Sequence, residues 1–188
     1  MGEPVKPRAL IIHGPIGCGK TRRALELAER ARQRGYRVLG LVSLRVVEDG
    51  ETTGYTGVDL ASGEGFPLVK LTSLAEGSDW RRLGEWKYSF SDAGFQRANA
   101  VLEEAAEALD AETVVVADEY GHIELRGMGI HRGVARAAEA LERGGCLVVI
   151  CRTDKVEALV EMLPEAAAVQ VAEADDPDFW GGLRDWFN

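Results

Sequence analysis

Residues 14–21 read GPIGCGKT and separate two segments of different character. Residues 9–12 before them form a short apolar run, which predicts a buried strand. The segment after them carries apolar residues at three- and four-residue spacing, which predicts a helix. The stretch itself fulfils the pattern G-x-x-x-x-G-K-[ST], the P-loop, in the strand-to-helix context that this pattern requires. It therefore predicts a loop that holds the phosphates of a nucleoside triphosphate.

Each part of this loop has a physical task. Glycines let the backbone approach a phosphate closely, and successive N–H groups attract the anion together with the positive end of the following helix. We expect Lys20 to reach the β- and γ-phosphates and the Thr21 hydroxyl to bind Mg²⁺. The predicted nucleotide-binding residues are Gly14, Pro15, Ile16, Gly17, Cys18, Gly19, Lys20, Thr21 and Arg22.

An acidic pair follows the apolar run of residues 113–117. P-loop enzymes hold magnesium with a second carboxylate at the end of such a strand, so we predict Asp118 as a metal residue beside Thr21. Glu119 comes next and is placed to orient or deprotonate an attacking water molecule. Lys20 and Glu119 are therefore predicted catalytic residues, and Mg²⁺ is the predicted cofactor.

A further cation is expected near the transferred phosphate, because the transition state spreads negative charge over the phosphate oxygens. Arg152 directly follows the apolar run of residues 146–151. It would lie at the carboxyl edge of the sheet, where open α/β folds bind nucleotides. We predict Arg152 as the third catalytic residue. The alternatives are Arg126, Arg132 and Arg136, with His122 and His131 as further candidates for phosphate contact.

The chain alternates predicted strands and helices at both ends, which predicts an α/β fold. Its sheet should be mostly parallel, with helices on both faces. Residues 38–71 hold three strand patterns separated by turn signals, which predicts a small antiparallel β insert after the first helix. Residues 74–90 show no clear period and are predicted to form a loop. Further elements are predicted at residues 92–109 (helix), 113–117 (strand), 131–143 (helix), 146–150 (strand), 154–162 (helix), 169–172 (strand) and 177–187 (short helix). We expect residues 1–188 to form a single domain.

Composition and net charge indicate which classes of protein this sequence fits. The 188 residues are 46% hydrophobic, which is enough for one domain with a sizeable core. A formal net charge of −9 disfavours nucleic acid or an anionic membrane as the main partner. The three cysteines show no metal-ligand spacing, so we expect reduced thiols. We find no apolar signal core and no run near the ~18–20 apolar residues of a membrane helix, and we expect a cytoplasmic protein. The sequence does not identify a protein partner.

The most specific resemblance to known proteins lies in DEYGHIEL at residues 118–125. Together with the phosphate loop, this stretch resembles the small P-loop family of nucleoside-triphosphatases first recognised in thermophiles, which includes a cancer-related nucleoside-triphosphatase. Three further stretches are similar to the family pattern: GLVS at residues 40–43, GYTGVDLASG at residues 54–63 and LGEWKYSF at residues 83–90.

The resemblance implies slow, magnesium-dependent hydrolysis of ATP, GTP and other nucleoside triphosphates by an α/β P-loop domain. It carries the family's magnesium acid onto Asp118, its water-activating carboxylate onto Glu119 and a structural position onto Glu124. The chain departs from the family at His122, at Thr52 and Thr53, and at Asp154 and Lys155. The phosphate and magnesium residues are intact, while positions suited to contact the base are altered.

Three functions fit these observations. The leading one is a magnesium-dependent nucleoside-triphosphatase. A nucleotide or small-molecule kinase shares the loop and the chain length, but it needs an acceptor pocket, and the sequence shows no clear acceptor motif. A nucleotide-dependent switch or adaptor without significant turnover is the third. A GTPase switch is disfavoured, since the guanine signature N-K-x-D is missing.

Overall fold

The computed structural model describes residues 7–184 and residue 186. Within these residues, a nine-stranded sheet has the order β5-β6-β4-β3-β2-β7-β8-β1-β9. Its last five strands run parallel to one another, and every residue of the central β8 is buried because helices cover both faces there. The parallel strands are β1 (Arg8–His13), β2 (Arg37–Glu48), β7 (Thr113–Tyr120), β8 (Cys146–Cys151) and β9 (Ala168–Glu173).

Strand β2 joins the parallel half of the sheet to an antiparallel half. Its residues 37–41 pair in parallel with β7, and residues 41–48 pair in antiparallel fashion with β3. The predicted antiparallel strands within residues 38–71 are confirmed, and they extend the same sheet. The antiparallel half continues through β3 (Glu51–Asp59), β4 (Gly65–Leu71), β6 (Tyr88–Ser91) and β5 (Trp80–Arg82).

The prediction of a loop over residues 74–90 is wrong. This segment contains β5 and the start of β6, which pair with each other, and β6 also pairs with β4. The two strands have only three and four residues, so the alternation of their side chains is too short to stand out in the sequence. The pairing of β6 with β4, and of β5 with β6, supplies the stabilisation that these short segments lack by themselves.

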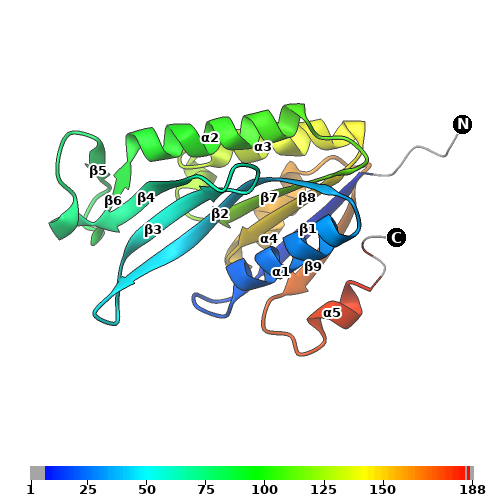
Figure 1. Ribbon diagram of the computed structural model, residues 1–188, viewed down its shortest axis with the longest axis horizontal. Coiled ribbons are helices and arrows are strands. Elements are labelled where there is room, and N and C mark those ends of the chain that lie inside the picture. Colours follow the sequence, from blue (N-terminus) through cyan, green and yellow to red (C-terminus); the bar gives the residue numbers. More distant parts are fainter. Residues whose placement is uncertain (1–6, 185, 187–188) are drawn as a thin grey trace, which may run out of the picture.

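Helices cover both faces of the sheet, as predicted (Figure 1). Helices α2 and α3 pack against each other on one face, and the same apolar core includes residues of α4. Helices α1 and α5 contribute to the core of the opposite face. No helix in the described part of the chain is long and apolar enough to cross a lipid bilayer. The helices are α1 (Lys20–Gln33), α2 (Asp92–Glu107), α3 (His131–Ala140), α4 (Val156–Met162) and α5 (Phe179–Gly182).

Helix ends differ from the predicted ones where the chain forms short 3₁₀ turns. The helix predicted over residues 131–143 ends in η3 (Leu141–Arg143), and the one predicted over residues 154–162 starts with η4 (Thr153–Lys155). The helix predicted for residues 177–187 is only the four residues of α5; residues 185 and 187 of that range lie outside the described residues. Two further turns are η1 (Thr72–Leu74) and η2 (Glu124–Arg126).

Candidate active site

The loop between β1 and α1 adopts a conformation that requires glycine at two positions. Gly14 has a φ of +150°, and a Cβ atom built there would lie 2.6 Å from the Sγ atom of Cys18. Gly19 has a φ of +95° and forms the N-cap of α1, in a region of φ that L side chains rarely adopt. The loop therefore turns directly into the positive end of the α1 dipole.

The ammonium group of Lys20 folds over this loop. Its Nζ donates hydrogen bonds to the carbonyl oxygens of Gly14, at 3.0 Å, and Pro15, at 2.7 Å. Lys20 also lines a cavity at this edge of the sheet. A lysine ammonium has three donors, so two contacts to the loop leave one donor for an anion in the cavity.

Thr21 and Asp118 come from distant parts of the chain and meet beside the loop. The Thr21 hydroxyl donates a hydrogen bond of 2.7 Å to Oδ2 of Asp118, and the backbone N–H of Ser43 donates one of 3.1 Å to the same oxygen. The other carboxylate oxygen, Oδ1, is buried and has no hydrogen-bond partner among the described residues. The two residues predicted to bind the metal therefore lie together, with one carboxylate oxygen free.

The environment of Asp118 opposes its charge. Burial, followed by the charge of Glu119, raises the pKa of its carboxyl to about 7, although the hydrogen bonds from Thr21 and Ser43 act to lower it. A buried carboxylate with one unpartnered oxygen is costly to keep ionised. A cation beside Oδ1 would remove much of that cost, which makes this position suitable for a metal ion.

Glu119 has an unusual backbone conformation. Its φ is +74°, in the left-handed region that costs a non-glycine residue about 1–2 kcal/mol. The pairing of β7 with β8 shifts register between Ala117 and Tyr120, so the strand is irregular where Glu119 lies. The side chain lines the cavity. Burial raises the pKa of its carboxyl, and the charge of Lys20 lowers it. Glu119 therefore lies within electrostatic reach of the loop lysine.

Arg152 lines the same cavity from the end of β8. Its Nη1 atom lies 3.3 Å from Nε2 of His122, which is also in the cavity wall, and its Nε atom lies 3.5 Å from Oδ1 of Asp154. His131 does not line the cavity, and its Nδ1 atom lies 3.0 Å from the Tyr120 hydroxyl. The other candidate arginines, Arg126, Arg132 and Arg136, are not in the cavity wall either.

Glu124 is a buried residue of the cavity wall and holds the segment between β7 and α3. Its Oε2 accepts a hydrogen bond of 2.8 Å from the N–H of Gly121, and its Oε1 accepts one of 3.2 Å from the N–H of Ile130. Burial raises the pKa of Glu124 to about 7, against these hydrogen bonds. The contacts fit the structural role that the family resemblance implies.

The cavity has a volume of about 710 Å³ and lies at the carboxyl ends of the parallel strands. Its wall includes the acidic pair, Arg152 and much of the phosphate loop. The loop residues that line it are Ile16, Gly17, Gly19, Lys20, Thr21 and Arg22. The remaining three, Gly14, Pro15 and Cys18, are not part of the cavity wall.

The sequence matches the model of the family described as NTPase over residues 9–176. This range contains the phosphate loop, the acidic pair and Arg152. The chain belongs to this NTPase family.

One curated relative and two solved structures are similar to this chain. The nucleoside-triphosphatase THEP1 of Methanopyrus kandleri is 31% identical over 134 residues, which cover 71% of this chain and 69% of the relative. The crystal structure of THEP1 from the hyperthermophile Aquifex aeolicus superposes with a TM-score of 0.70 at 21% identity, covering 95% of this chain and 96% of the other. The solution structure of a human cancer-related nucleoside triphosphatase superposes with a TM-score of 0.66 at 23% identity, covering 95% of this chain and 95% of the other. The two structures support the fold.

Two parts of this NTPase cavity were not predicted from the sequence. The backbone N–H of Ser43 supports Asp118, and a group of aromatic side chains lines the end of the cavity away from the loop. A signal for the second part does exist in the sequence. Aromatic residues alternate at positions 86, 88 and 90, which is the spacing of a strand with one aromatic face.

Proposed function

We propose that this member of the NTPase family hydrolyses nucleoside triphosphates to nucleoside diphosphate and phosphate with Mg²⁺. The observation that carries the proposal is the 2.7 Å contact between Thr21 and Asp118 at the N-terminus of α1. Lys20 and Glu119 line the cavity at the same place. The name of the 31% identical relative, a nucleoside-triphosphatase, supports the same reaction class.

The available oxygens suit a hydrated magnesium ion. Magnesium prefers oxygen ligands and keeps several of its waters, so it needs only one or two protein oxygens beside the substrate phosphates. The Thr21 hydroxyl and the unpartnered Oδ1 of Asp118 are such oxygens. When bound, the ion would neutralise charge that develops on the phosphate oxygens.

Side chains and backbone groups of the chain have the remaining roles in phosphate binding and hydrolysis. The loop N–H groups and Lys20 hold the β- and γ-phosphates, because both present positive charge at the N-terminus of α1. Glu119 orients the attacking water and accepts its proton, and burial, which raises the pKa of its carboxyl, makes it a better proton acceptor. Arg152 supplies positive charge to the phosphate oxygens in the transition state.

The test is a panel of ATP, GTP, CTP and UTP, each with Mg²⁺ and with EDTA. Calorimetry measures the affinity and a phosphate assay measures the release of phosphate. We expect release that requires Mg²⁺, and the panel gives the base preference. Tight binding without release would instead favour the nucleotide-dependent adaptor.

A further inference from the structure

The cavity extends far beyond the phosphate loop. The loop follows β1, the acidic pair lies on β7, and Tyr55 of the cavity wall lies on β3, four strands away from β1 in the sheet. Neighbouring strands lie about 4.8 Å apart, so four steps correspond to about 19 Å. Ligand pockets range from about 300 to 1,000 Å³, and a cavity of about 710 Å³ has room for more than a phosphate chain.

The end of the cavity away from the loop has an aromatic wall, which we call the aromatic compartment. Its rings are in contact with one another: the centroids of Tyr55 and Tyr88 are 6.3 Å apart, and those of Trp86 and Phe90 are 5.8 Å apart. Trp86 is 45% exposed. Aromatic side chains gathered in this way in an open cavity are suited to bind a flat ring. The compartment consists of Tyr55, Leu68, Trp86, Tyr88, Phe90 and Phe95.

Polar groups lie between the aromatic compartment and the acidic pair. Arg45 is directly opposite Tyr55 in the pairing of β2 with β3, and both residues line the cavity. Arg45 forms no ion pair within the described part of the chain. Burial and the charge of Glu119 raise the pKa of the Tyr55 hydroxyl, while the charge of Arg45 lowers it. The hydroxyl therefore lies within reach of both charges.

The compartment is on the side of the terminal phosphate. In the proposed function, the metal ion and the β- and γ-phosphates lie beside Thr21 and Asp118. The inference about the compartment rests on that function. From the loop on β1 the sheet passes through β8 to Glu119 on β7, and then through β2 to Tyr55 on β3. A molecule in the compartment would face the terminal phosphate, whereas the base of the bound nucleotide is attached at the other end of the phosphate chain.

We propose that the aromatic compartment binds a second ligand of the nucleoside class, a flat heteroaromatic ring joined to a hydroxyl-bearing group, while the nucleotide occupies the phosphate loop. The ring lies against Trp86, Tyr88 and Phe90, because aromatic side chains stack on any base. The hydroxyl groups meet Tyr55, Arg45 and Glu119, which together offer donors and acceptors. An uncharged ligand suits a compartment with a carboxylate and a guanidinium at the same end.

The test measures the binding of adenosine, guanosine, cytidine and thymidine by ligand-observed NMR, with and without saturating MgADP. Methyl riboside, which has no ring to stack, is the control ligand. Trp86→Ala removes the most exposed ring of the compartment, and Trp86→Phe keeps an aromatic ring there. Trp80→Ala is the matched control, since Trp80 lies on β5 and does not line the cavity.

We expect at least one nucleoside to bind in the presence of MgADP, and methyl riboside not to bind. Trp86→Ala should weaken that nucleoside about tenfold, in the range of a lost base–aromatic stack, while Trp86→Phe and Trp80→Ala stay within about threefold. The proposal is overturned when no nucleoside binds, when MgADP displaces it, or when Trp80→Ala weakens it as much as Trp86→Ala does.

The experiment tests the proposed hydrolase function and the proposed nucleoside site independently of each other. Nucleoside binding that depends on Trp86, in a protein that releases no phosphate from any triphosphate, would support the compartment and contradict the hydrolase. Phosphate release without nucleoside binding would support the hydrolase and contradict the compartment. Thermal melting of each variant shows that a lost signal is not a lost fold.

Discussion

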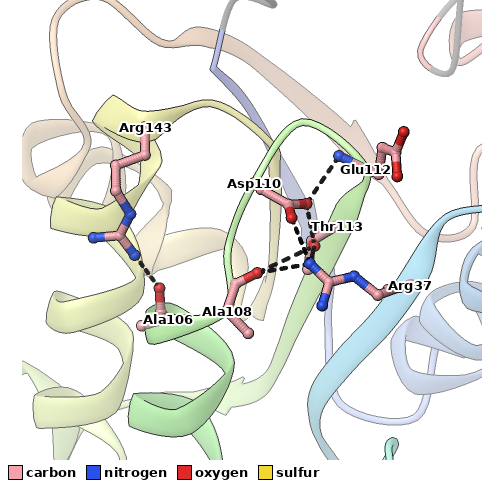
Figure 2. A network of polar contacts seen from close by, with 7 residues as sticks. All are labelled: Arg37, Ala106, Ala108, Asp110, Glu112, Thr113 and Arg143. Carbon is pink, nitrogen blue, oxygen red and sulfur yellow. Dashed lines mark hydrogen bonds and ion pairs between the residues drawn. The ribbon is translucent and has the colours of Figure 1, made fainter.

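Two aspartates at the two ends of β7 are in opposite situations. Asp110 lies before the strand, where its Oδ2 accepts a hydrogen bond from Arg37 at 2.5 Å and its Oδ1 accepts one from the Thr113 hydroxyl at 2.6 Å (Figure 2). The hydrogen bond from Thr113 is the largest cause of a lowered pKa at Asp110. Asp118 lies near the other end, where burial raises its pKa to about 7 and one of its oxygens has no partner among the described residues.

The contrast between the two aspartates indicates that the two edges of the sheet have different roles. At the amino end, polar groups satisfy one another, and the same Arg37 also donates to the carbonyl oxygen of Ala108, where α2 ends. That end ties α2 to the sheet. At the carboxyl end, the described residues leave one carboxylate oxygen of Asp118 without a partner and place positive charge in an open cavity, where a ligand can bind. Changes at the carboxyl end should therefore affect binding and turnover, and changes at the amino end should affect stability.

Lys20→Ala should have the largest effect on the carboxyl end. The substitution removes the main point charge from the phosphate loop, and we expect calorimetry to detect no binding of MgATP. Lys70→Ala is the control, because Lys70 lies on β4 outside the loop and should leave the affinity unchanged. Unchanged affinity in the Lys20 variant would refute the assignment of the loop.

Glu119→Gln should separate binding from chemistry at the same end. The amide keeps the shape of the side chain but cannot accept the proton of the attacking water. We expect the affinity for MgATP to be retained and phosphate release to fall by on the order of 100-fold or more, the scale of general-base catalysis. Turnover at the wild-type rate would remove Glu119 from the mechanism.

The pH dependence of stability should have opposite signs at the two ends. The ordinary pKa of an aspartate is about 4, so between about pH 4 and 7 the folded protein holds a proton on Asp118 that the unfolded chain releases. Stability therefore falls as pH rises through this range. In EDTA we expect the melting temperature to fall by on the order of 5 °C from pH 5 to pH 8. Glu124, whose pKa is also raised to about 7, contributes with the same sign.

Asp118→Asn and Asp110→Asn are the paired variants for this measurement. The first should reduce the fall above pH 5, because the buried carboxyl no longer ionises. The second should leave that fall intact and instead remove stability that the wild type loses only in acid, since the pKa of Asp110 is lowered. A full-sized fall in Asp118→Asn would show that Asp118 is not its source.

Thr113→Val should have the smallest effect and only on stability. Valine has the shape of threonine, but it cannot make the hydrogen bonds of the buried hydroxyl with Asp110 and Arg37. We expect a loss of about 1 kcal/mol in the free energy of unfolding, measured with urea, and unchanged phosphate release. Slower release in this variant would mean that the two ends of β7 are coupled.

The sequence predicted the carboxyl end better than the amino end. A strand, a glycine-rich turn and a helix leave few alternatives for residues 9–21, and an acidic pair after an apolar strand has a known partner in that motif. Of the two partners of Asp118, Thr21 was predicted to lie beside it and the N–H of Ser43 was not. The bonds of Arg37 to Asp110 and Thr113 carry no comparable local signal, because they join the start of β2 to the start of β7.

The antiparallel half of the sheet was predicted only in part. The three strands within residues 38–71 are long enough for turn signals and branched residues to mark them. Strands β5 and β6 depend on contacts with β4 and with each other, which no local period records. For the aromatic compartment, the alternation at positions 86, 88 and 90 is a local signal for one aromatic face only, and Tyr55 and Phe95 join that face only after the strands have paired.

The left-handed backbone at Glu119 lowers the thermal stability that this protein would otherwise have. Glycine adopts such a φ freely, so glycine at position 119 would relieve this cost. The chain would then lack the carboxylate that lines the cavity. If Glu119 acts as proposed, a higher melting temperature and a working reaction are alternatives at this position.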